Sequence, residues 1–353
     1  MKTSTRLMLV LPFLLAGCAS MGPPTIERDR FDYVSGISES WKRQMLLNLL
    51  KVRYADAPVF MDVASVISSY SLEGEVHLGG NYANVGRGDT FGSVGATGRY
   101  ADKPTITYQP LSGDKFARSL MAPIPVSGLL ALIQAGYPAD LVLRICANSI
   151  NGHENDFGGA SNPRTGSPKF REILTVLRQS QGAGGAGFRT KAGKDKQAVV
   201  MYLRPLGDDT EPVVRRMREL LGLEPGAREA TVVYGSFPEP DGEIAILTRS
   251  ILQVMIDLSA QVDVPEADVA EGRVHRPKRT AEQERLYPPL IAVRTGPEAP
   301  QDAYAAVRYR SRWHWIDDRD PQTKQALSFL MMLFSLTEGT QAQGAPVVTI
   351  PAR

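Results

Sequence analysis

The sequence SYSLEGEVHLGGNY at residues 69–82 decides the fold class of this chain. Apolar residues or glycine at the even positions from Tyr70 to Tyr82 alternate with polar residues or glycine at the odd positions. A period of two is typical of a β-strand with one apolar and one solvated face. The glycine-rich turn at residues 84–89 leads into residues 91–100, which alternate more weakly. The pattern predicts a long amphipathic β-hairpin near residues 68–100.

Helical and strand patterns are mixed through the rest of the chain. Residues 38–53 have apolar side chains at helical spacing, and residues 322–336 are a strongly apolar helical segment. Shorter helices are predicted at 129–134, 138–150, 168–177, 212–221 and 249–262, and strands at 105–108, 198–204, 231–234, 244–247, 291–294 and 303–316. The predicted fold class is α+β, with mixed helices and largely antiparallel strands.

Glycine, proline and charge divide the chain into regions. The glycine-rich run at 182–187 predicts a flexible break between an N-terminal α+β region, 31–181, and a C-terminal one, 188–338. The charged run 266–284 is expected to be a solvated loop. Residues 339–353 are interpreted as a loose tail.

The N-terminus carries a processing signal. Residues 1–6 are cationic, residues 7–15 are apolar, and Leu15-Ala16-Gly17-Cys18 follows. The apolar run is too short to span a bilayer, which needs about 20 residues. Leu15–Cys18 resembles the lipobox of bacterial lipoprotein precursors. The resemblance implies that residues 1–17 are a signal peptide and that Cys18 becomes an N-terminus carrying fatty acyl chains such as palmitate.

The residues after Cys18 indicate where such a lipoprotein would reside. Lipoproteins retained at the inner membrane often have aspartate after the cysteine, whereas this chain has alanine, so the resemblance favours the outer membrane. Residues 18–30, with two prolines, are interpreted as a short tether that reaches about 40 Å at most. We therefore expect a body close to the membrane, facing the periplasm, with the acyl chains on Cys18 as its contact with lipid.

The charge balance bears on the possible partners. The chain has 40 lysines and arginines against 38 aspartates and glutamates, and the signal peptide accounts for two of the basic residues and no acid. Proteins that bind nucleic acids generally carry a marked basic excess. We expect no nucleic-acid partner.

The hairpin offers one functional hypothesis. Twelve steps from Tyr70 to Tyr82 span about 40 Å, or about 28 Å along the membrane normal at a tilt near 45°. Leu72, Val76, Leu78, Val94 and Ala96 would form its lipid face. One hairpin cannot close a barrel, so a pore requires a ring of subunits that each donate strands. The alternative is a sheet packed on soluble helices.

A second resemblance points to an enzyme. Ser112–Lys115 matches the S-x-x-K pattern of penicillin-binding proteins and β-lactamases, and Ser149–Asn151 and Arg294–Gly296 follow in that family's motif order. Arg294 replaces the family's lysine, and the first two motifs are unusually close. The resemblance implies a serine acyltransferase or hydrolase with Ser112 as nucleophile, activated by Lys115. As an alternative, Ser112 caps a helix.

Two clusters of charge lie near the C-terminus. Arg308, Arg310, Arg312 and His314 would form a cationic ladder if residues 303–316 were one strand, and a turn at 310–311 would scatter them. Three aspartates, at 317, 318 and 320, suggest either calcium ligands or the cap of the last helix, and the cap is simpler because the calcium-loop pattern is missing.

Metal and cofactor sites are not expected. The four histidines, at 77, 153, 275 and 314, are widely separated and lack ligand spacing, and no nucleotide-binding glycine motif follows a strand. Cys146 lies in an apolar segment and is expected to be buried and inert.

Together these patterns predict a non-enzymatic structural or envelope-assembly lipoprotein of the outer membrane. We expect an envelope protein or further copies of the chain as its partner. The alternatives are an oligomeric channel built from the hairpin and the serine enzyme.

Overall fold

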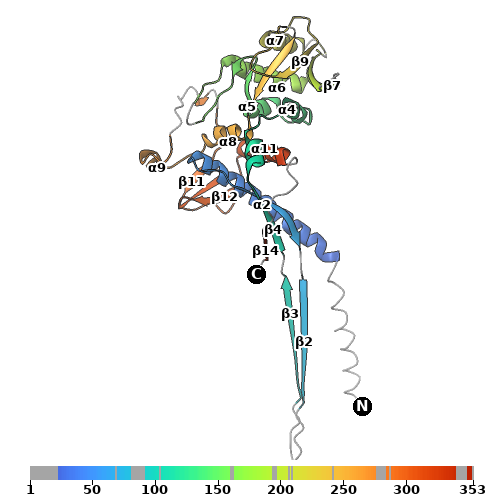
Figure 1. Cartoon of the computed structure of the whole chain (residues 1–353), viewed down its shortest axis with the longest axis vertical. Helices are drawn as coiled ribbons and strands as arrows, with labels where there is room; N and C mark the ends of the chain where they lie inside the picture. The colour runs from blue at the N-terminus through green and yellow to red at the C-terminus, as the bar shows by residue number, and fades with distance from the viewer. Residues whose placement is uncertain are drawn as a thin grey trace, which may run out of the picture. The chain divides into compact units, whose positions relative to one another are not determined.

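The structure is α+β, which confirms the predicted class (Figure 1). The computed structural model describes residues 23–67, 70–80, 92–102, 105–159, 163–192, 197–205, 207, 210–240, 242–275, 284–285, 288–338 and 348–351. It divides into two compact units. The body comprises residues 1–58 and 114–341, and the strand unit comprises residues 59–113 and 342–353.

The body contains a six-stranded mixed sheet in the order β6-β5-β10-β9-β8-β7. Its strands are β5 (Ala147–Ile150), β6 (His153–Glu154), β7 (Ala186–Ala192), β8 (Gln197–Leu203), β9 (Glu229–Tyr234) and β10 (Glu243–Thr248). Only β9 and β10 pair in parallel. Because β10 also pairs with β5, strands from both sides of the glycine-rich run belong to one sheet.

Helices supply most of the core of the body. They are α2 (Pro23–Arg53), α3 (Asp114–Met121), α4 (Val126–Gln134), α5 (Ala139–Cys146), α6 (Pro168–Ala183), α7 (Glu211–Leu221), α8 (Ile251–Ser259), α9 (Glu266–Ala270) and α11 (Pro321–Glu338). The C-terminal half of α2 packs against α8, α11 and β12 and buries Leu46, Leu49 and Leu50 completely. Burying a leucine side chain contributes about 1.5–3 kcal/mol, so these contacts fix α2 to the body.

The second sheet of the body, β11-β13-β12, is antiparallel. Its strands are β11 (Arg294–Gly296), β12 (Ala303–Tyr309) and β13 (Arg312–Asp317). The prediction of one strand over residues 303–316 is wrong. Arg310 and Ser311 have φ of 47° and 66°, the left-handed conformation that a two-residue hairpin turn requires at both central positions.

Helix ends follow the expected chemistry in several places. The side chain of Ser167 accepts a hydrogen bond from the Phe170 N–H at the start of α6, and Ser250 and Gln253 form a capping box on α8. Asp320 accepts from the Thr323 N–H at 3.0 Å, which confirms its predicted role as the cap of the last helix. Gly184 and Gly222 end α6 and α7 in the left-handed conformation.

Four local predictions differ from the structure. Helix α2 starts at Pro23, so residues 23–30 are helical although they were interpreted as tether. The helix predicted over 138–150 ends at Cys146, because residues 147–150 pair with β10 and β6 as strand β5. The run 182–187 forms the end of α6 and the start of β7, and residues 266–270 in the predicted loop form α9.

The domain prediction also differs from the observed division. The regions 31–181 and 188–338 share one six-stranded sheet in the body, so the glycine-rich run is not a boundary. Within this run, Gly184 ends α6 with a positive φ. The chain then continues directly into β7. The observed second unit is made instead of residues 59–113 and the C-terminus.

The strand unit contains a three-stranded antiparallel sheet, β1-β4-β14, and a two-stranded sheet, β2-β3. Its strands are β1 (Phe60–Ile67), β2 (Tyr70–Gly80), β3 (Gly92–Asp102), β4 (Thr105–Leu111) and β14 (Val348–Pro351). The prediction of a loose tail over 339–353 is wrong for residues 348–351, which pair with β4. The segment Val348-Thr349-Ile350 is β-branched, which suits a strand.

Among the helices that the structure describes, none is long and apolar enough to cross a membrane.

Candidate membrane-contacting ribbon

Strands β2 and β3, here called the ribbon, pair over eleven consecutive positions from Tyr70 opposite Asp102 to Gly80 opposite Gly92. Figure 1 draws them as two long arrows side by side. The same register offset holds from Ile67 opposite Thr105 to Ser65 opposite Thr107 in β1 and β4. One antiparallel register therefore runs from the three-stranded sheet into the ribbon, and its single irregularity lies between Val63 and Ser65.

The register determines which residues share a face of the ribbon. Residues directly opposite each other in an antiparallel pair lie on the same face. One face contains the pairs Tyr70–Asp102, Leu72–Tyr100, Gly74–Gly98, Val76–Ala96, Leu78–Val94 and Gly80–Gly92, and the other contains Ser71–Ala101, Glu73–Arg99, Glu75–Thr97, His77–Gly95 and Gly79–Ser93. The five residues predicted as a lipid face thus all lie on one face. Glu73, Glu75 and Arg99 lie on the opposite face, and Asp102, opposite Tyr70 at one end of the ribbon, lies on the first face.

The ribbon is long enough to cross an outer membrane. Ten steps of about 3.3–3.4 Å give about 33 Å, or about 23 Å along the membrane normal at a tilt near 45°. The apolar band of outer-membrane barrels is about 25 Å tall. The match rests on the paired positions alone and does not involve the loop between them.

Within the described chain, β2 and β3 have only each other as strand neighbours. The outer edge of each strand therefore presents backbone N–H and C=O groups that no described strand pairs. A two-stranded hairpin by itself is marginally stable in water. Each strand of the ribbon can form backbone hydrogen bonds with a further strand along its outer edge.

The lipidation residue predicted from sequence, Cys18, lies outside the described residues, as does the turn at 84–89. The acylation of Cys18 stays a prediction. The second cysteine, Cys146, is buried at the end of α5, and burial raises the pKa of its thiol. This confirms that Cys146 is a buried core residue, and a thiol of raised pKa is expected to be unreactive.

The segments of the serine-enzyme hypothesis lie on separate elements. Ser112 is exposed at the end of the strand unit, and Lys115 belongs to α3 of the body. Ser149 is buried on β5 of the six-stranded sheet. The side chain of Asn151 donates to the Leu221 carbonyl at 2.9 Å and accepts from the Ala245 N–H at 2.7 Å.

The third segment belongs to yet another sheet. Thr295 lies on β11, where its hydroxyl is 2.9 Å from Nδ1 of His314. Asn151 and Thr295 thus hold neighbouring elements together. The acyltransferase interpretation stays a prediction without support from this placement.

The turn at 310–311 scatters the predicted cationic ladder. Arg308 and Arg312 are exposed on different strands, whereas His314 is buried with 1% of its surface accessible. The guanidinium of Arg310 lies 4.5 Å from the ring centroid of Tyr54 and 3.7 Å from an Asp56 carboxylate oxygen. Arg310 therefore ties the turn to the end of α2, and the ladder alternative is wrong.

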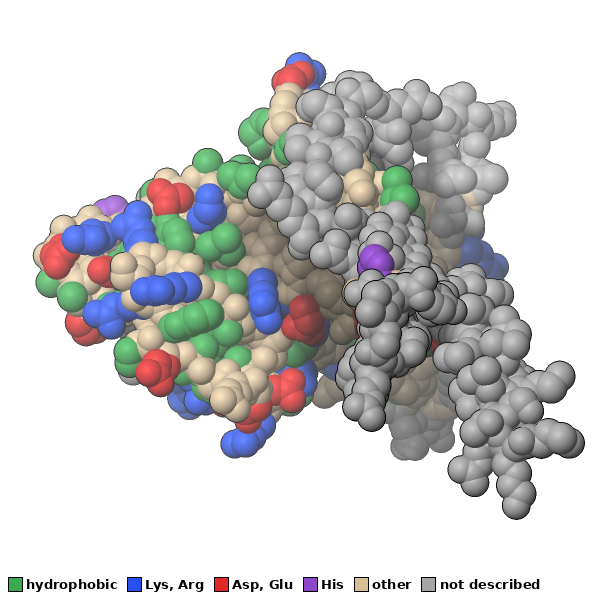
Figure 2. Space-filling view, turned by 90° about the horizontal axis from the view of Figure 1, so that it is seen from below, with side chains coloured by type: hydrophobic (Ala, Val, Ile, Leu, Met, Phe, Trp, Pro, Cys, Tyr) green, Lys and Arg blue, Asp and Glu red, His purple; other side chains and the backbone are tan. Residues whose placement is uncertain are grey.

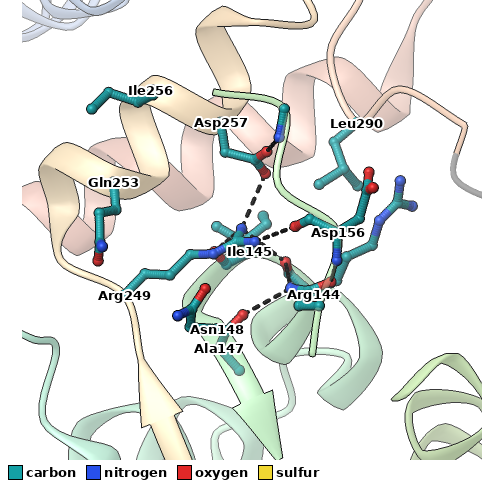
Figure 3. Close-up of polar contacts among 12 residues, drawn as sticks. Arg144, Ile145, Ala147, Asn148, Asp156, Arg249, Gln253, Ile256, Asp257 and Leu290 are labelled. Atoms are coloured by element: carbon teal, nitrogen blue, oxygen red, sulfur yellow. Dashed lines mark hydrogen bonds and ion pairs between the residues drawn. The ribbon is translucent and has the colours of Figure 1, made fainter. Parts of the chain in front are cut away.

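Sequence reasoning missed the main polar cluster of the body, which surrounds Arg249 (Figure 3). The guanidinium is 1% exposed and donates from Nη1 to Oδ2 of Asp257 at 3.0 Å and to the Ile145 carbonyl at 3.1 Å. Nη2 donates to the Asp156 carbonyl. The other carboxylate oxygen of Asp257 accepts from the Gly158 N–H at 2.6 Å.

The partners in this cluster come from distant parts of the chain. Asn155 also donates from Nδ2 to the carbonyls of Arg144 and Ala147, both at 2.8 Å. The cluster therefore joins the end of α5 and the segment after β6 to the start of α8. The spacing of eight residues between Arg249 and Asp257 is the one signal available in the sequence, and it is weak.

The charged side chains of the body are well mixed. On the face shown in Figure 2, lysine and arginine lie among aspartate and glutamate over the part that is described. This agrees with the near-balance of charge in the sequence. Among the residues outside the masked segments, no three His, Cys, Asp or Glu side chains gather where they could hold a metal ion.

No protein-family model, curated protein sequence or solved structure matches this chain.

Proposed function

We propose that this chain is a lipoprotein anchored in the bacterial outer membrane through acyl chains on Cys18. Its body faces the periplasm, and it works as a non-enzymatic envelope component. Several copies insert their ribbons into the membrane together to form a channel. The observation that carries this proposal is the register of the ribbon, which places Glu73, Glu75 and Arg99 on the face opposite Leu72, Val76, Leu78, Val94 and Ala96 and leaves one charged residue, Asp102, at one end of the apolar face.

The free edges of the ribbon support the oligomer. In hydrocarbon, every backbone N–H and C=O group must be paired, so an isolated two-stranded ribbon is excluded there. A closed ring of ribbons pairs both edges of each one and removes all edges. In such a ring, β3 of one copy lies beside β2 of the next, so all strands alternate in direction. Two strands from each copy always give an even number, as in bacterial outer-membrane barrels.

The faces then acquire distinct roles. The face with Leu72, Val76 and Val94 meets lipid, and the face with Glu73, Glu75 and Arg99 lines a polar lumen. This is the apolar-out, polar-in alternation of membrane barrels. The acyl anchor expected on Cys18, five positions before the start of α2, would hold the chain at the same membrane.

The test compares two neighbouring positions on opposite faces, Ala96 and Thr97. Each is replaced singly by cysteine in the full-length acylated protein, labelled with an environment-sensitive fluorophore, and reconstituted into vesicles that contain nitroxide-labelled lipid. We expect strong quenching by the nitroxide at position 96, and severalfold weaker quenching with access to aqueous iodide at position 97.

The two native cysteines should not interfere with the labelling. Cys146 is buried and Cys18 is expected to be acylated, so wild-type protein should take up little label. Aqueous access at both positions in membranes, with no difference in nitroxide quenching, would contradict insertion of the ribbon. In planar bilayers, wild-type protein should give discrete conductance steps, and their absence would contradict the channel.

A further inference from the structure

The three-stranded sheet of the strand unit has two different outer strands, β1 and β14, which lie on opposite sides of β4. Its order is β1-β4-β14, so in the described chain β1 and β14 each have a strand neighbour on one side only. One copy of the chain thus offers two different edges. Two different edges on one protein pair head to tail, and repeated head-to-tail contacts close into a ring when the rotation between copies allows it.

The β1 edge is apolar and exposed. Ile67 is 59% exposed and Met61 is 42% exposed, and the strand contains one charged residue, Asp62, with no lysine or proline. Natural edge strands are usually protected by charge, proline or short length. Residues 63–67 of this strand have none of these features and are a site for pairing with another strand.

The β14 edge is short and β-branched. Its residues Val348, Thr349 and Ile350 suit a strand, and Pro351 ends it. Proline cannot donate a ladder hydrogen bond and is found at edges and strand ends, so β14 can offer a pairing edge of about three residues. It lies opposite the segment Thr105–Tyr108, the part of β4 next to the ribbon.

We infer that β1 of each copy pairs with β14 of the neighbouring copy. The paired strands form a continuous β-collar at the periplasmic base of the ribbons. This inference rests on the proposed function and identifies the contact between copies that holds the ring together. Within one copy β1 and β14 both run antiparallel to β4, so they share one direction. Under rotational symmetry, the new junction between copies is therefore parallel, which mixed sheets accommodate.

The collar also explains why the C-terminus belongs to the strand unit. The strand β14 adds one short strand per copy directly below the two strands of the ribbon. A ring of three strands per copy has a larger circumference than one of two, so the wall widens at its periplasmic end. The inference commits to a second copy of this chain as the acceptor for β14, because each copy carries both of the edges that the junction needs.

The test is a disulfide between copies in the full-length acylated protein. Ser65 and Thr349 both lie opposite Thr107, on either side of it, so they share one face of the sheet. Within one copy they are separated by two strand spacings, about 9–10 Å. A disulfide requires Cα atoms within about 7 Å, so Ser65→Cys with Thr349→Cys can form a disulfide only between copies.

Two further pairs complete the design. Ile67→Cys with Thr349→Cys is on the same face and covers a register shifted by two residues. Val66→Cys with Thr349→Cys places the thiols on opposite faces and serves as the matched control. In membranes under mild oxidation, we expect one same-face pair to give a ladder of cross-linked copies on a non-reducing gel. The single variants and the Val66 control should stay monomeric.

The outcomes separate this inference from the proposed function. Monomers from both same-face pairs, in protein whose ribbon still passes the quenching test, would overturn the collar and leave the channel. Equal cross-linking by the Val66 control would mean random collision and would also overturn the collar. A ladder in protein whose ribbon stays aqueous would support the collar and contradict the channel.

Discussion

The body and the strand unit bury their apolar residues in different ways. In the body, Leu49, Met255 and Leu330 are almost fully enclosed by other elements of the same chain. In the ribbon, β2 and β3 form a sheet of two strands with no third strand from the described chain. The body has the contacts of a self-sufficient domain, whereas a two-stranded ribbon is only marginally stable in water, which is why we propose that further copies complete it. The comparison shows that the two units of this chain differ in how far their described residues enclose their own apolar side chains.

The tryptophans give a way to observe the body alone. All three, Trp41, Trp313 and Trp315, belong to the body. Intrinsic fluorescence during urea unfolding in mild detergent therefore reports on the stability of the body. Vesicle insertion and conductance report on the ribbon. The predictions below use these two measurements to separate the units, from the largest expected effect to the smallest.

The largest effect is expected for Arg249→Met in the body. The substitution leaves the Asp257 carboxylate buried without its cation, which costs about 3–5 kcal/mol of unfolding free energy. The exposed pair Arg273–Glu271, with both side chains 54% exposed, provides the matched control. Arg273→Met should change the stability by less than about 1 kcal/mol. Equal losses in the two variants would contradict the structural role of the buried cluster.

A lysine in the ribbon should impair membrane insertion without changing the stability of the body. Ala96→Lys places a charge on the lipid-facing side, at a cost of about 2–4 kcal/mol per copy near the bilayer midplane. We expect loss of conductance and of vesicle insertion, with an unchanged urea midpoint. Thr97→Lys lies on the lumen face and should keep both activities. If both variants insert equally well, the assignment of faces is wrong.

A glycine in the β12–β13 turn should stabilise the body slightly. Ser311 has φ of 66°, a conformation that costs a non-glycine residue about 1 kcal/mol. Ser311→Gly should raise the unfolding free energy by roughly 0.5–1 kcal/mol. Arg310→Gly gains the same relief but loses the contacts with Tyr54 and Asp56, so it should be less favourable. A greater gain for Arg310→Gly would contradict the anchoring role of that side chain.

The smallest effect is a pH dependence confined to the body. Burial lowers the pKa of His314, so the folded state binds a proton less readily than the unfolded state. Stability from this group is complete above the unfolded pKa of about 6.5 and is lost as the pH falls toward the lower folded pKa. The urea midpoint should fall less steeply below pH 6.5 in His314→Gln. Burial also lowers the pKa of His153, but His153 is present in both proteins. Parallel profiles would contradict this assignment.

The ribbon could be predicted from sequence because it depends on a local period of two. The same alternation that predicts a strand also places Val76 and Ala96 on one face once the register is known. Helix ends at Asp320 and Gly222 were likewise predictable, because caps depend on residues within one turn. These features need no information from distant parts of the chain.

Features set by distant pairing could not be predicted. Residues 147–150 become strand β5 because β10, about a hundred positions later, pairs with them. The C-terminal β14 depends on β4 in the same way, which is why a loose tail was expected. The partners of Arg249 include Ile145 and Asp156, and no local spacing connects them. Tertiary context decided each of these cases over local propensity.

The most direct test of the central claim is the native mass of the full-length acylated protein after extraction from its membrane in mild detergent. If the ribbons of several copies pair edge to edge, we expect one discrete homo-oligomer, with a mass that is a whole multiple of the mass of the acylated chain. The same species should be lost in Ala96→Lys and kept in Thr97→Lys. A monomer in detergents that preserve other membrane assemblies would contradict the claim that the ribbon is completed by further copies of this chain.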